Sequence, residues 1–139
     1  MVRVVNGSLP APPHLGVNDG HLAGCPASPN CVGSQGEEGS HRVEPLRFSD
    51  IPAAAWARLH RALGGMRGAT LVREEPNYRH YAFRTAVFGF VDDVELLLDE
   101  ESRVIHVRSA SRRGHSDLGT NRRRVEAIRA RFAPTGSEI

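Results

Sequence analysis

Two cysteines in a proline-containing loop are the residues of this sequence best suited to covalent chemistry. Cys25 and Cys31 are close enough in sequence for a disulfide, and in a reducing compartment both would remain thiols. A metal site would have to recruit His21 and His41, and the spacing matches no common zinc motif. A thiol enzyme would use Cys31 as nucleophile and His41 as base, although nothing in the sequence brings the two together. We therefore expect a structural pair, with no metal and no cofactor, and keep the other two hypotheses as alternatives.

The segment from Ser109 to Asp117 is the strongest candidate for ligand binding. It joins an expected strand to an expected helix and carries hydroxyls, arginines and a glycine. A helix amino terminus attracts anions through its unpaired N–H groups, and arginine binds carboxylates and phosphates with its planar fork of donors. The predicted ligand is an anionic small molecule or headgroup, bound by Arg108, Ser109, Ser111, Arg112, Asp117 and Arg122, with Asp92 and Asn121 orienting the arginines.

The same segment also has a purely structural interpretation. Ser116 or Asp117 could cap the helix, and Gly114 could supply a positive φ. A carboxylate of the fold, Asp92 or Asp93, could already occupy the arginines, because buried charges need partners. A small interaction domain without a ligand therefore stays an alternative to the binding domain.

The acidic residues nearby favour pairing within the fold over metal binding. Asp92 and Asp93 are adjacent, so on a strand they point to opposite faces and cannot chelate one ion together. Asp93 and Glu95 share a face, and we expect Arg108 and His106 to neutralise them across the strand ladder.

The charge pattern argues against nucleic acid as a partner. All 18 basic residues are arginine, and the net charge is only +2. Residues 103–132 hold nine arginines and two acids, whereas residues 92–101 hold six acids and no base. A fold that pairs these segments cancels most of both charges. The run from Arg122 to Arg124 spreads through about 200° of a helix and forms no single basic stripe.

The helices and strands that must position these residues indicate an α+β domain. A helix begins near Ser49 or Asp50 and ends at Gly64, with Trp56, Leu59 and Leu63 on one face. Strands are expected at residues 69–73, 78–87, 91–98 and 103–109. The last helix covers about 118–132, with one face formed by Leu118, Asn121, Val125, Ile128 and Phe132. We predict an antiparallel sheet of about four strands flanked by an N-terminal and a C-terminal helix, with a long irregular N-terminal arm at residues 1–24, one domain at 25–134 and a tail at 135–139.

An acidic turn from Asp99 to Ser102 suggests a specific register for the hairpin around it. A four-residue turn there places Leu98 opposite Arg103. The mostly apolar face then pairs Leu96 with Ile105, Val94 with Val107 and Asp92 with Ser109. The other face pairs Leu97 with Val104, Glu95 with His106 and Asp93 with Arg108.

The N-terminal residues resemble neither a secretory nor a mitochondrial signal. Prolines and glycines interrupt residues 1–21, so no apolar run forms. The tetrapeptide from Leu22 to Cys25 is similar to a lipobox but lacks the hydrophobic segment that would precede it. No stretch reaches the apolar length that spans a bilayer. We expect a cytoplasmic protein with no membrane span.

Two stretches carry a family resemblance. The first is the run from Cys25 to Gln35, and the second starts at Phe88-Gly89-Phe90-Val91-Asp92-Asp93 and continues in the segments 107–112 and 117–122. Together they are similar to the domain of unknown function 1499 family of bacteria and plastids, over residues 15–132. Many members resemble exported or membrane-attached proteins, and this chain differs by lacking a visible leader. The resemblance implies no agreed reaction, so no catalytic residue follows from it.

Overall fold

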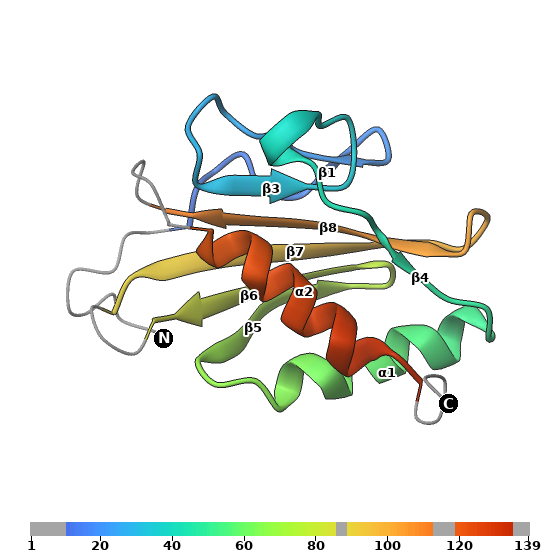
Figure 1. Cartoon of the computed structure of the whole chain (residues 1–139). Helices are drawn as coiled ribbons and strands as arrows, with labels where there is room; N and C mark the ends of the chain where they lie inside the picture. The colour runs from blue at the N-terminus through green and yellow to red at the C-terminus, as the bar shows by residue number, and fades with distance from the viewer. Residues whose placement is uncertain (1–10, 86–88, 113–118, 135–139) are drawn as a thin grey trace.

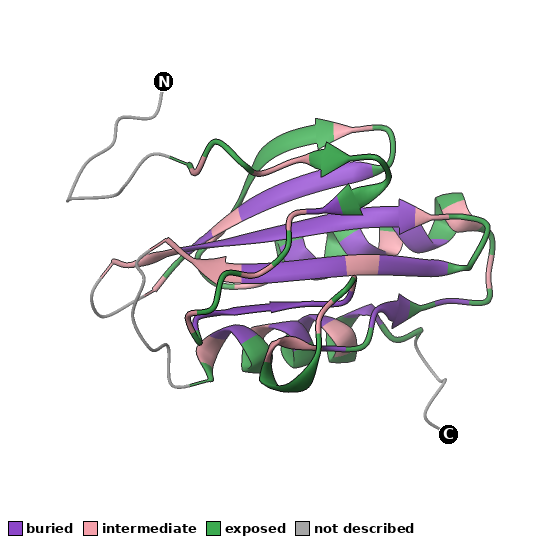
Figure 2. Cartoon of the chain, turned by 90° about the horizontal axis from the view of Figure 1, so that it is seen from above, coloured by how far each residue is buried: buried purple, intermediate pink, exposed green. Residues whose placement is uncertain are grey.

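The computed structural model describes residues 11–85, 89–112 and 119–134, which form three layers (Figures 1 and 2). Two helices lie on one face of a twisted sheet, and the N-terminal segment lies on the other face. The elements are β1 (Val17–Asn18), β2 (His21–Leu22), β3 (Cys31–Gly33), the 3-10 turn η1 (Gly39–His41), β4 (Leu46–Arg47), α1 (Pro52–Gly64), β5 (Ala69–Glu75), β6 (Tyr78–Arg84), β7 (Val91–Asp99), β8 (Val104–Ser111) and α2 (Thr120–Phe132).

The main sheet has six strands, where the sequence predicts about four. Its order is β3-β8-β7-β6-β5, with β4 also paired to β8, and all neighbours are antiparallel. The predicted strands are β5 to β8. The additional strands come from a segment that we expected to be loop. They were not predicted because two or three residues are too few to show alternation. They use different parts of the β8 edge: Cys31 pairs with Ala110, and Leu46 pairs with Ile105.

Both helices cover the same face of the sheet, so the expectation of a flanked sheet is met only in part. Helix α1 ends at Gly64 as predicted, but the predicted cap is wrong: Ile51 precedes Pro52, and no side chain caps the helix. Asp50 instead accepts a hydrogen bond from Arg58 at 2.5 Å. No helix within the described ranges is long and apolar enough to cross a membrane.

The core lies between the helices and the sheet, and it uses the predicted helix faces. Helix α1 buries Trp56, Leu59 and Leu63. Helix α2 buries the predicted residues Asn121, Val125, Ile128 and Phe132, while Leu118 is outside the described residues. They pack against Tyr81, Phe83, Val94, Leu96, Leu98, Ile105 and Val107 of the sheet.

The hairpin of β7 and β8 has the predicted faces, but its register differs by two residues. Leu98 pairs with Ile105 instead of Arg103. The turn lies between Asp99 and Val104, and Arg103 within it has a φ of 58°. A shift of two residues leaves every side chain on its own face, so hydrophobic alternation cannot detect it.

The register change alters the partners of the charged residues. Glu95 lies opposite Arg108 and not His106, and Asp93 lies opposite Ala110 and not Arg108. The other predicted pairs are replaced in the same way: Asp92 with Ser111, Val94 with Ser109, Leu96 with Val107 and Leu97 with His106. Asp99, which was expected in the turn, pairs with Val104.

The N-terminal segment covers the face of the sheet that the helices leave open (Figure 2). Within it, β1 and β2 form a two-stranded antiparallel hairpin. Leu22 is buried against Tyr78 and Leu97. The N–H of Gly16 donates to Glu95 Oε2 at 2.7 Å. The expected arm therefore contains a short hairpin, while the domain boundaries remain predictions.

Candidate functional site

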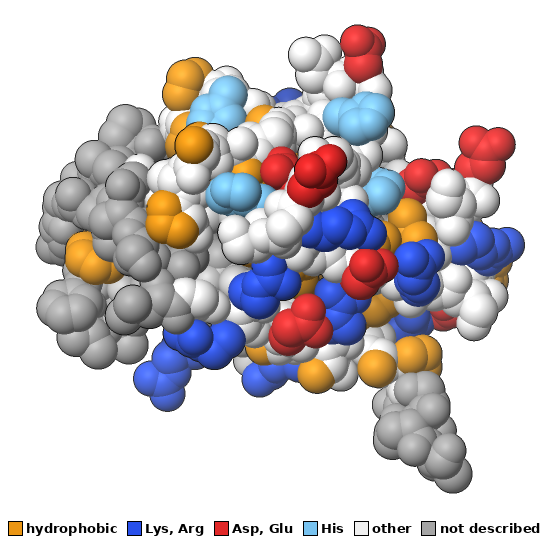
Figure 3. All heavy atoms as spheres, turned by 45° about the horizontal axis from the view of Figure 1, so that its top comes forward, with side chains coloured by type: hydrophobic (Ala, Val, Ile, Leu, Met, Phe, Trp, Pro, Cys, Tyr) orange, Lys and Arg blue, Asp and Glu red, His pale blue; other side chains and the backbone are white. Residues whose placement is uncertain are grey.

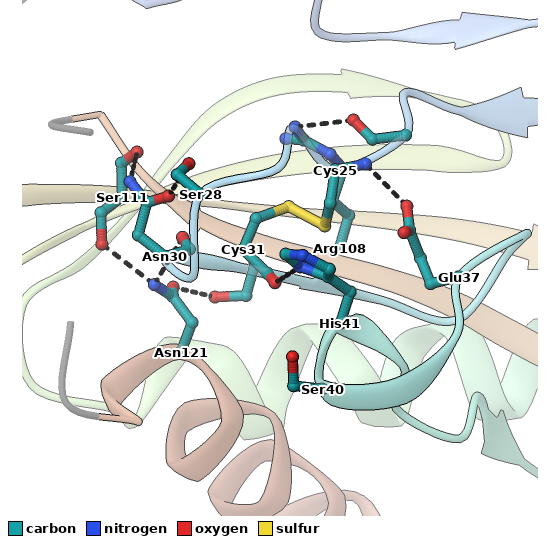
Figure 4. Close-up of a disulfide and its surroundings, with 12 residues drawn as sticks. Cys25, Ser28, Asn30, Cys31, Glu37, Ser40, His41, Arg108, Ser111 and Asn121 are labelled. Atoms are coloured by element: carbon teal, nitrogen blue, oxygen red, sulfur yellow. Dashed lines mark hydrogen bonds between the residues drawn. A yellow bond between two sulfur atoms is a disulfide. The ribbon is translucent and has the colours of Figure 1, made fainter. Parts of the chain in front are cut away.

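The two cysteines form a disulfide beside the first strand of the sheet (Figure 4). Cys25 and Cys31 are bonded through their Sγ atoms, with Cα atoms 5.6 Å apart. Cys31 begins β3 and is buried, and the N–H of Cys25 donates to Glu37 Oε2 at 2.6 Å. In this oxidised form Cys31 has no thiol to ionise as a nucleophile or a metal ligand.

The histidine considered as the base of a thiol enzyme binds backbone instead. His41 Nδ1 donates to the carbonyl of Cys31 at 2.9 Å, which holds η1 against β3 (Figure 4). Among the residues that the structure describes, no group of three or more His, Cys, Asp or Glu could hold a metal ion. The Cys25–Cys31 disulfide closes the short loop of residues 26–30.

A cluster of hydroxyls and amides joins α2 to the sheet. Asn121, which is fully buried, accepts a hydrogen bond from Ser109 Oγ at 2.6 Å. Its amide nitrogen donates to Ser111 Oγ at 3.0 Å and to the carbonyl of Asn30 at 3.2 Å. Figure 4 shows Asn30 between Ser111 and Asn121. Both amide hydrogens of Asn121 are thus used within the fold, which favours a structural role.

Asp92 occupies the helix side of β7 and pairs with a different arginine from those predicted. Its Oδ2 accepts a hydrogen bond from Arg124 at 2.6 Å, and its side chain is 3% exposed. Arg124 also stacks on Phe83 and donates to Asn121 Oδ1. Asp92 and Asn121 therefore contact Arg124, whereas we predicted that they orient Arg108, Arg112 and Arg122.

Asp93 lies on the opposite face, between an arginine and a histidine. Arg112 binds both of its oxygens, through Nε and Nη2, each at 2.9 Å. His80 Nε2 lies 2.7 Å from Oδ1. Burial would raise the pKa of Asp93, but the hydrogen bonds from His80 and Arg112 outweigh it and lower the pKa. The carboxylate thus stays ionised and occupies much of the Arg112 fork.

The lowered pKa of Asp93 predicts an acid-sensitive contribution to stability. The ionised carboxylate stabilises the fold above the unfolded-state value of 3.8, and this contribution is lost as the pH falls through the lower folded-state pKa. We expect Asp93→Asn to be less stable than wild type by a constant amount near neutral pH. The difference should shrink in acid, as measured by urea unfolding at a series of pH values. A difference that stayed constant down to acid pH would contradict the role assigned to this carboxylate.

Glu95 and Arg108 form a second buried pair that is incompletely satisfied. Glu95 Oε2 accepts hydrogen bonds from the Tyr78 hydroxyl at 2.6 Å and from the N–H of Gly16. Burial, and then this bond to Glu95, raise the pKa of Tyr78, so its hydroxyl remains a donor. Arg108 Nη1 lies 3.6 Å from Glu95 Oε1, too far for a hydrogen bond. Glu95 Oε1 and Arg108 Nε are both buried and have no hydrogen-bond partner among the described residues.

A cavity of about 240 Å³ lies between these buried charges and the disulfide loop. The sheet contributes Asp93, Arg108 and the end of β8. The segment around the disulfide contributes small and polar side chains, and the N-terminal segment closes one side. The lining residues are Pro12, His14, Leu15, Pro26, Ser28, Asn30, Cys31, Asp93, Arg108, Ala110, Ser111 and Arg112.

The structure separates the residues that we predicted to form one ligand site. Arg108, Ser111 and Arg112 line the cavity, whereas Ser109, Asn121 and Asp92 belong to the helix side. Asp117 lies outside the described residues. Arg122 donates to the carbonyls of Ser40 and Arg42, at 2.7 and 2.9 Å.

Much of the remaining surface charge is paired. Figure 3 shows Asp and Glu side chains lying among the arginines on one face of the molecule. Arg42 and Arg47 both contact Glu44, and Arg129 contacts Glu126. These exposed pairs lower the net field without forming a site.

Sequence reasoning missed the residues that complete the cavity. His80 does not line the cavity but binds Asp93, which does, and its alternation with Tyr78 along β6 was the available signal. The contributions of His14, Ser28 and Asn30 had no signal, because they depend on how two loops fold onto the sheet.

The fold and the cavity define a small α+β protein whose sheet carries paired buried charges on the face away from its helices. The chain belongs to the family described as protein of unknown function (DUF1499), whose model matches residues 21–132. The predicted resemblance is thereby confirmed over most of the chain. No curated protein matches the sequence.

Proposed function

We propose that this protein binds a small ligand bearing a carboxylate or phosphate group, in the cavity beside the disulfide. The observation that carries the proposal is that Arg108 is buried and has few hydrogen-bond acceptors around it. This residue lines the cavity, is only 3% exposed, and has five N–H donors. The described residues offer it one hydrogen-bond acceptor, the carbonyl of Gly24 at 3.3 Å.

A buried guanidinium with unused donors is costly, because it has lost water without gaining full replacement. An oxyanion supplies two or more acceptors in the geometry of the arginine fork. Ser28, Asn30 and Ser111 line the same space and are hydrogen-bonded to one another or to Asn121. Arg112 contributes less, since Asp93 already holds its fork.

The experiment is a thermal-unfolding titration with inorganic phosphate and with succinate as probes. A ligand that binds only the folded state stabilises it by about 2.7 kcal/mol at 100 times its Kd. We expect the unfolding midpoint to rise and saturate with at least one probe. The rise should disappear in the double variant Glu95→Gln with Arg108→Gln, which removes both buried charges together.

Arg47→Gln is the control, because Arg47 is an exposed arginine paired with Glu44 away from the cavity. Its response to the probe should equal that of wild type. A shift of the unfolding midpoint of the same size in the double variant would contradict the proposal. The absence of any saturating shift in wild type would contradict it as well.

The other predictions about function keep their status as hypotheses. A thiol-dependent reaction of Cys31 with His41 would require reduction of the disulfide first. A cytoplasmic location also remains a prediction, and the disulfide favours an oxidising compartment instead. An alkylating reagent added to cells would trap any free thiols of Cys25 and Cys31. Counting the alkylated cysteines would then distinguish the reduced form from the disulfide.

A further inference from the structure

One wall of the proposed ligand cavity is a segment that apolar packing does not hold in place. Residues 23–29 run between two buried residues, Leu22 and Asn30, and every residue of this segment is exposed or only partly buried. Pro26 and Ser28 of the segment line the cavity. Because the segment buries no residue completely, the position of this wall depends on its polar and covalent contacts.

The disulfide is the strongest of these contacts. It joins Cys25, which is partly exposed, to Cys31, which is 1% exposed and begins β3 (Figure 4). Hydrogen bonds also link the segment to its neighbours: the N–H of Cys25 donates to Glu37 Oε2, and Arg108 Nη2 donates to the carbonyl of Gly24. Each of these hydrogen bonds can be exchanged for one with water, whereas the covalent bond persists in every conformation.

The disulfide is open to a dithiol reductant at Cys25, the more exposed of its two residues. A thiolate of the reductant attacks Cys25 Sγ, and the S–S bond breaks as Cys31 leaves as a thiolate and takes up a proton. The second thiol of the reductant then attacks the reductant's own sulfur in this mixed disulfide and releases Cys25 as a thiol. Two electrons and two protons pass to the cysteines, and the reductant becomes a disulfide.

Breaking this bond changes the surroundings of Arg108. Gly24 precedes Cys25 in the chain, and its carbonyl is the acceptor that holds Arg108 at 3.3 Å. Without the covalent link, movement of residues 23–29 away from the sheet would admit water to a guanidinium that is 3% exposed. Water weakens the attraction between a guanidinium and an oxyanion, and a mobile wall has to be ordered again when a ligand binds.

We propose that the disulfide between Cys25 and Cys31 is a redox switch for this cavity, which binds its anionic ligand tightly in the oxidised protein and weakly in the reduced protein. The inference rests on the proposed function, since it concerns the regulation of the same site. Linkage makes the switch reciprocal, because a ligand that prefers the oxidised form opposes reduction by the same factor. The bound ligand therefore protects the bond that holds its site.

Calorimetric titration of the full chain with inorganic phosphate and with succinate, before and after reduction by dithiothreitol, tests the switch. The chain contains two cysteines, so dithiothreitol acts on this disulfide alone. Reduction should raise the Kd by about tenfold or more, because ordering the opened loop then opposes binding. The control is Cys25→Ala with Cys31→Ala, which should bind as weakly as the reduced protein and give one Kd with and without dithiothreitol.

Backbone order parameters from NMR relaxation show whether the effect of reduction is local. They should fall in residues 23–29 and stay near about 0.85 in β7. Loss of the circular dichroism signal on reduction would mean that the disulfide supports the whole fold, and it would contradict a local switch.

The outcomes of the titrations separate the switch from the proposed function. Equal Kd values for the oxidised and the reduced protein would contradict the switch and leave anion binding intact. Absence of binding to the oxidised protein would contradict the proposed function and the switch together. In a series of glutathione buffers, saturating phosphate should lower the equilibrium constant for reduction by the ratio of the two Kd values. A constant that phosphate does not change would contradict the coupling.

Discussion

Glu95→Gln should lower the free energy of unfolding by about 3 kcal/mol, although the substitution removes no heavy-atom volume. The glutamine can still accept the hydrogen bonds from Tyr78 and Gly16. What it loses is the negative charge 3.6 Å from Arg108, whose side chain is 3% exposed. A buried charge left without its partner costs about 3–5 kcal/mol. Urea unfolding monitored by circular dichroism measures the change.

The same variant also tests the proposed anion site. An uncompensated Arg108 should bind phosphate or succinate more tightly, so these anions should restore part of the lost stability. The double variant Glu95→Gln with Arg108→Gln should lose less unfolding free energy than either single variant, because no buried charge then lacks a partner. If the loss of unfolding free energy in the double variant equalled the sum of the losses in the two single variants, Glu95 and Arg108 would not be coupled. The interpretation of the pair would then be wrong.

Asn121→Ala is expected to lower the free energy of unfolding by about 3 kcal/mol. The amide is fully buried and holds Ser109, Ser111 and the carbonyl of Asn30 through three hydrogen bonds. Removing it leaves buried polar groups unsatisfied, at about 1–3 kcal/mol for each, and creates a small cavity. Alanine has a higher helix propensity than asparagine, which offsets a few tenths of a kcal/mol.

Glu126→Ala provides the comparison for Asn121→Ala, since it lies on the exposed side of the same helix. Its ion pair with Arg129 is largely solvated, so the change should stay within about 0.5 kcal/mol. Chemical unfolding curves of the two variants should therefore separate clearly. Comparable losses would mean that the Asn121 cluster adds nothing beyond helix propensity.

The sequence was sufficient to predict the helices and the long strands, because each carries enough residues to show a period. Trp56, Leu59 and Leu63 define a helix face at spacings of three and four, and the structure buries all three. Strands β3 and β4 were missed for the opposite reason. Their two or three residues gain regular structure only from the β8 edge, a contact between distant segments.

The hairpin register shows where hydrophobic alternation stops being informative. Alternation fixes the face of Glu95 but not its partner, because a shift of two residues conserves every face. The partner is set by the turn, and Arg103 at a φ of 58° lengthens β7 by one residue relative to the expected hairpin. The pairing of Glu95 with Arg108 follows from this backbone conformation.

Sequence reasoning picked out two arginines that line the cavity, but not most of the contacts that surround them. The arginines before α2 pointed to an anion site, and Arg108 and Arg112 do line one cavity. Asp93, which binds Arg112, was one of the two carboxylates expected to occupy the arginines. The partner of Arg108 could not be foreseen, since the carbonyl of Gly24 reaches it from 84 positions away in the sequence. Which arginine retains unused donors depends on such contacts and not on local pattern.

The way the N-terminal layer is attached has a consequence for amide hydrogen exchange. Leu22 is the one buried residue of the stretch 11–25, and Gly16 is fixed by a bond to a carboxylate instead of a core contact. Segments with so little apolar contact open at a fraction of the global unfolding free energy. The amide of Gly16 should therefore exchange far faster than those of β7. Each opening event would bring bulk water to Glu95 and Arg108, so the exchange rate at Gly16 would measure how often the buried charges become accessible.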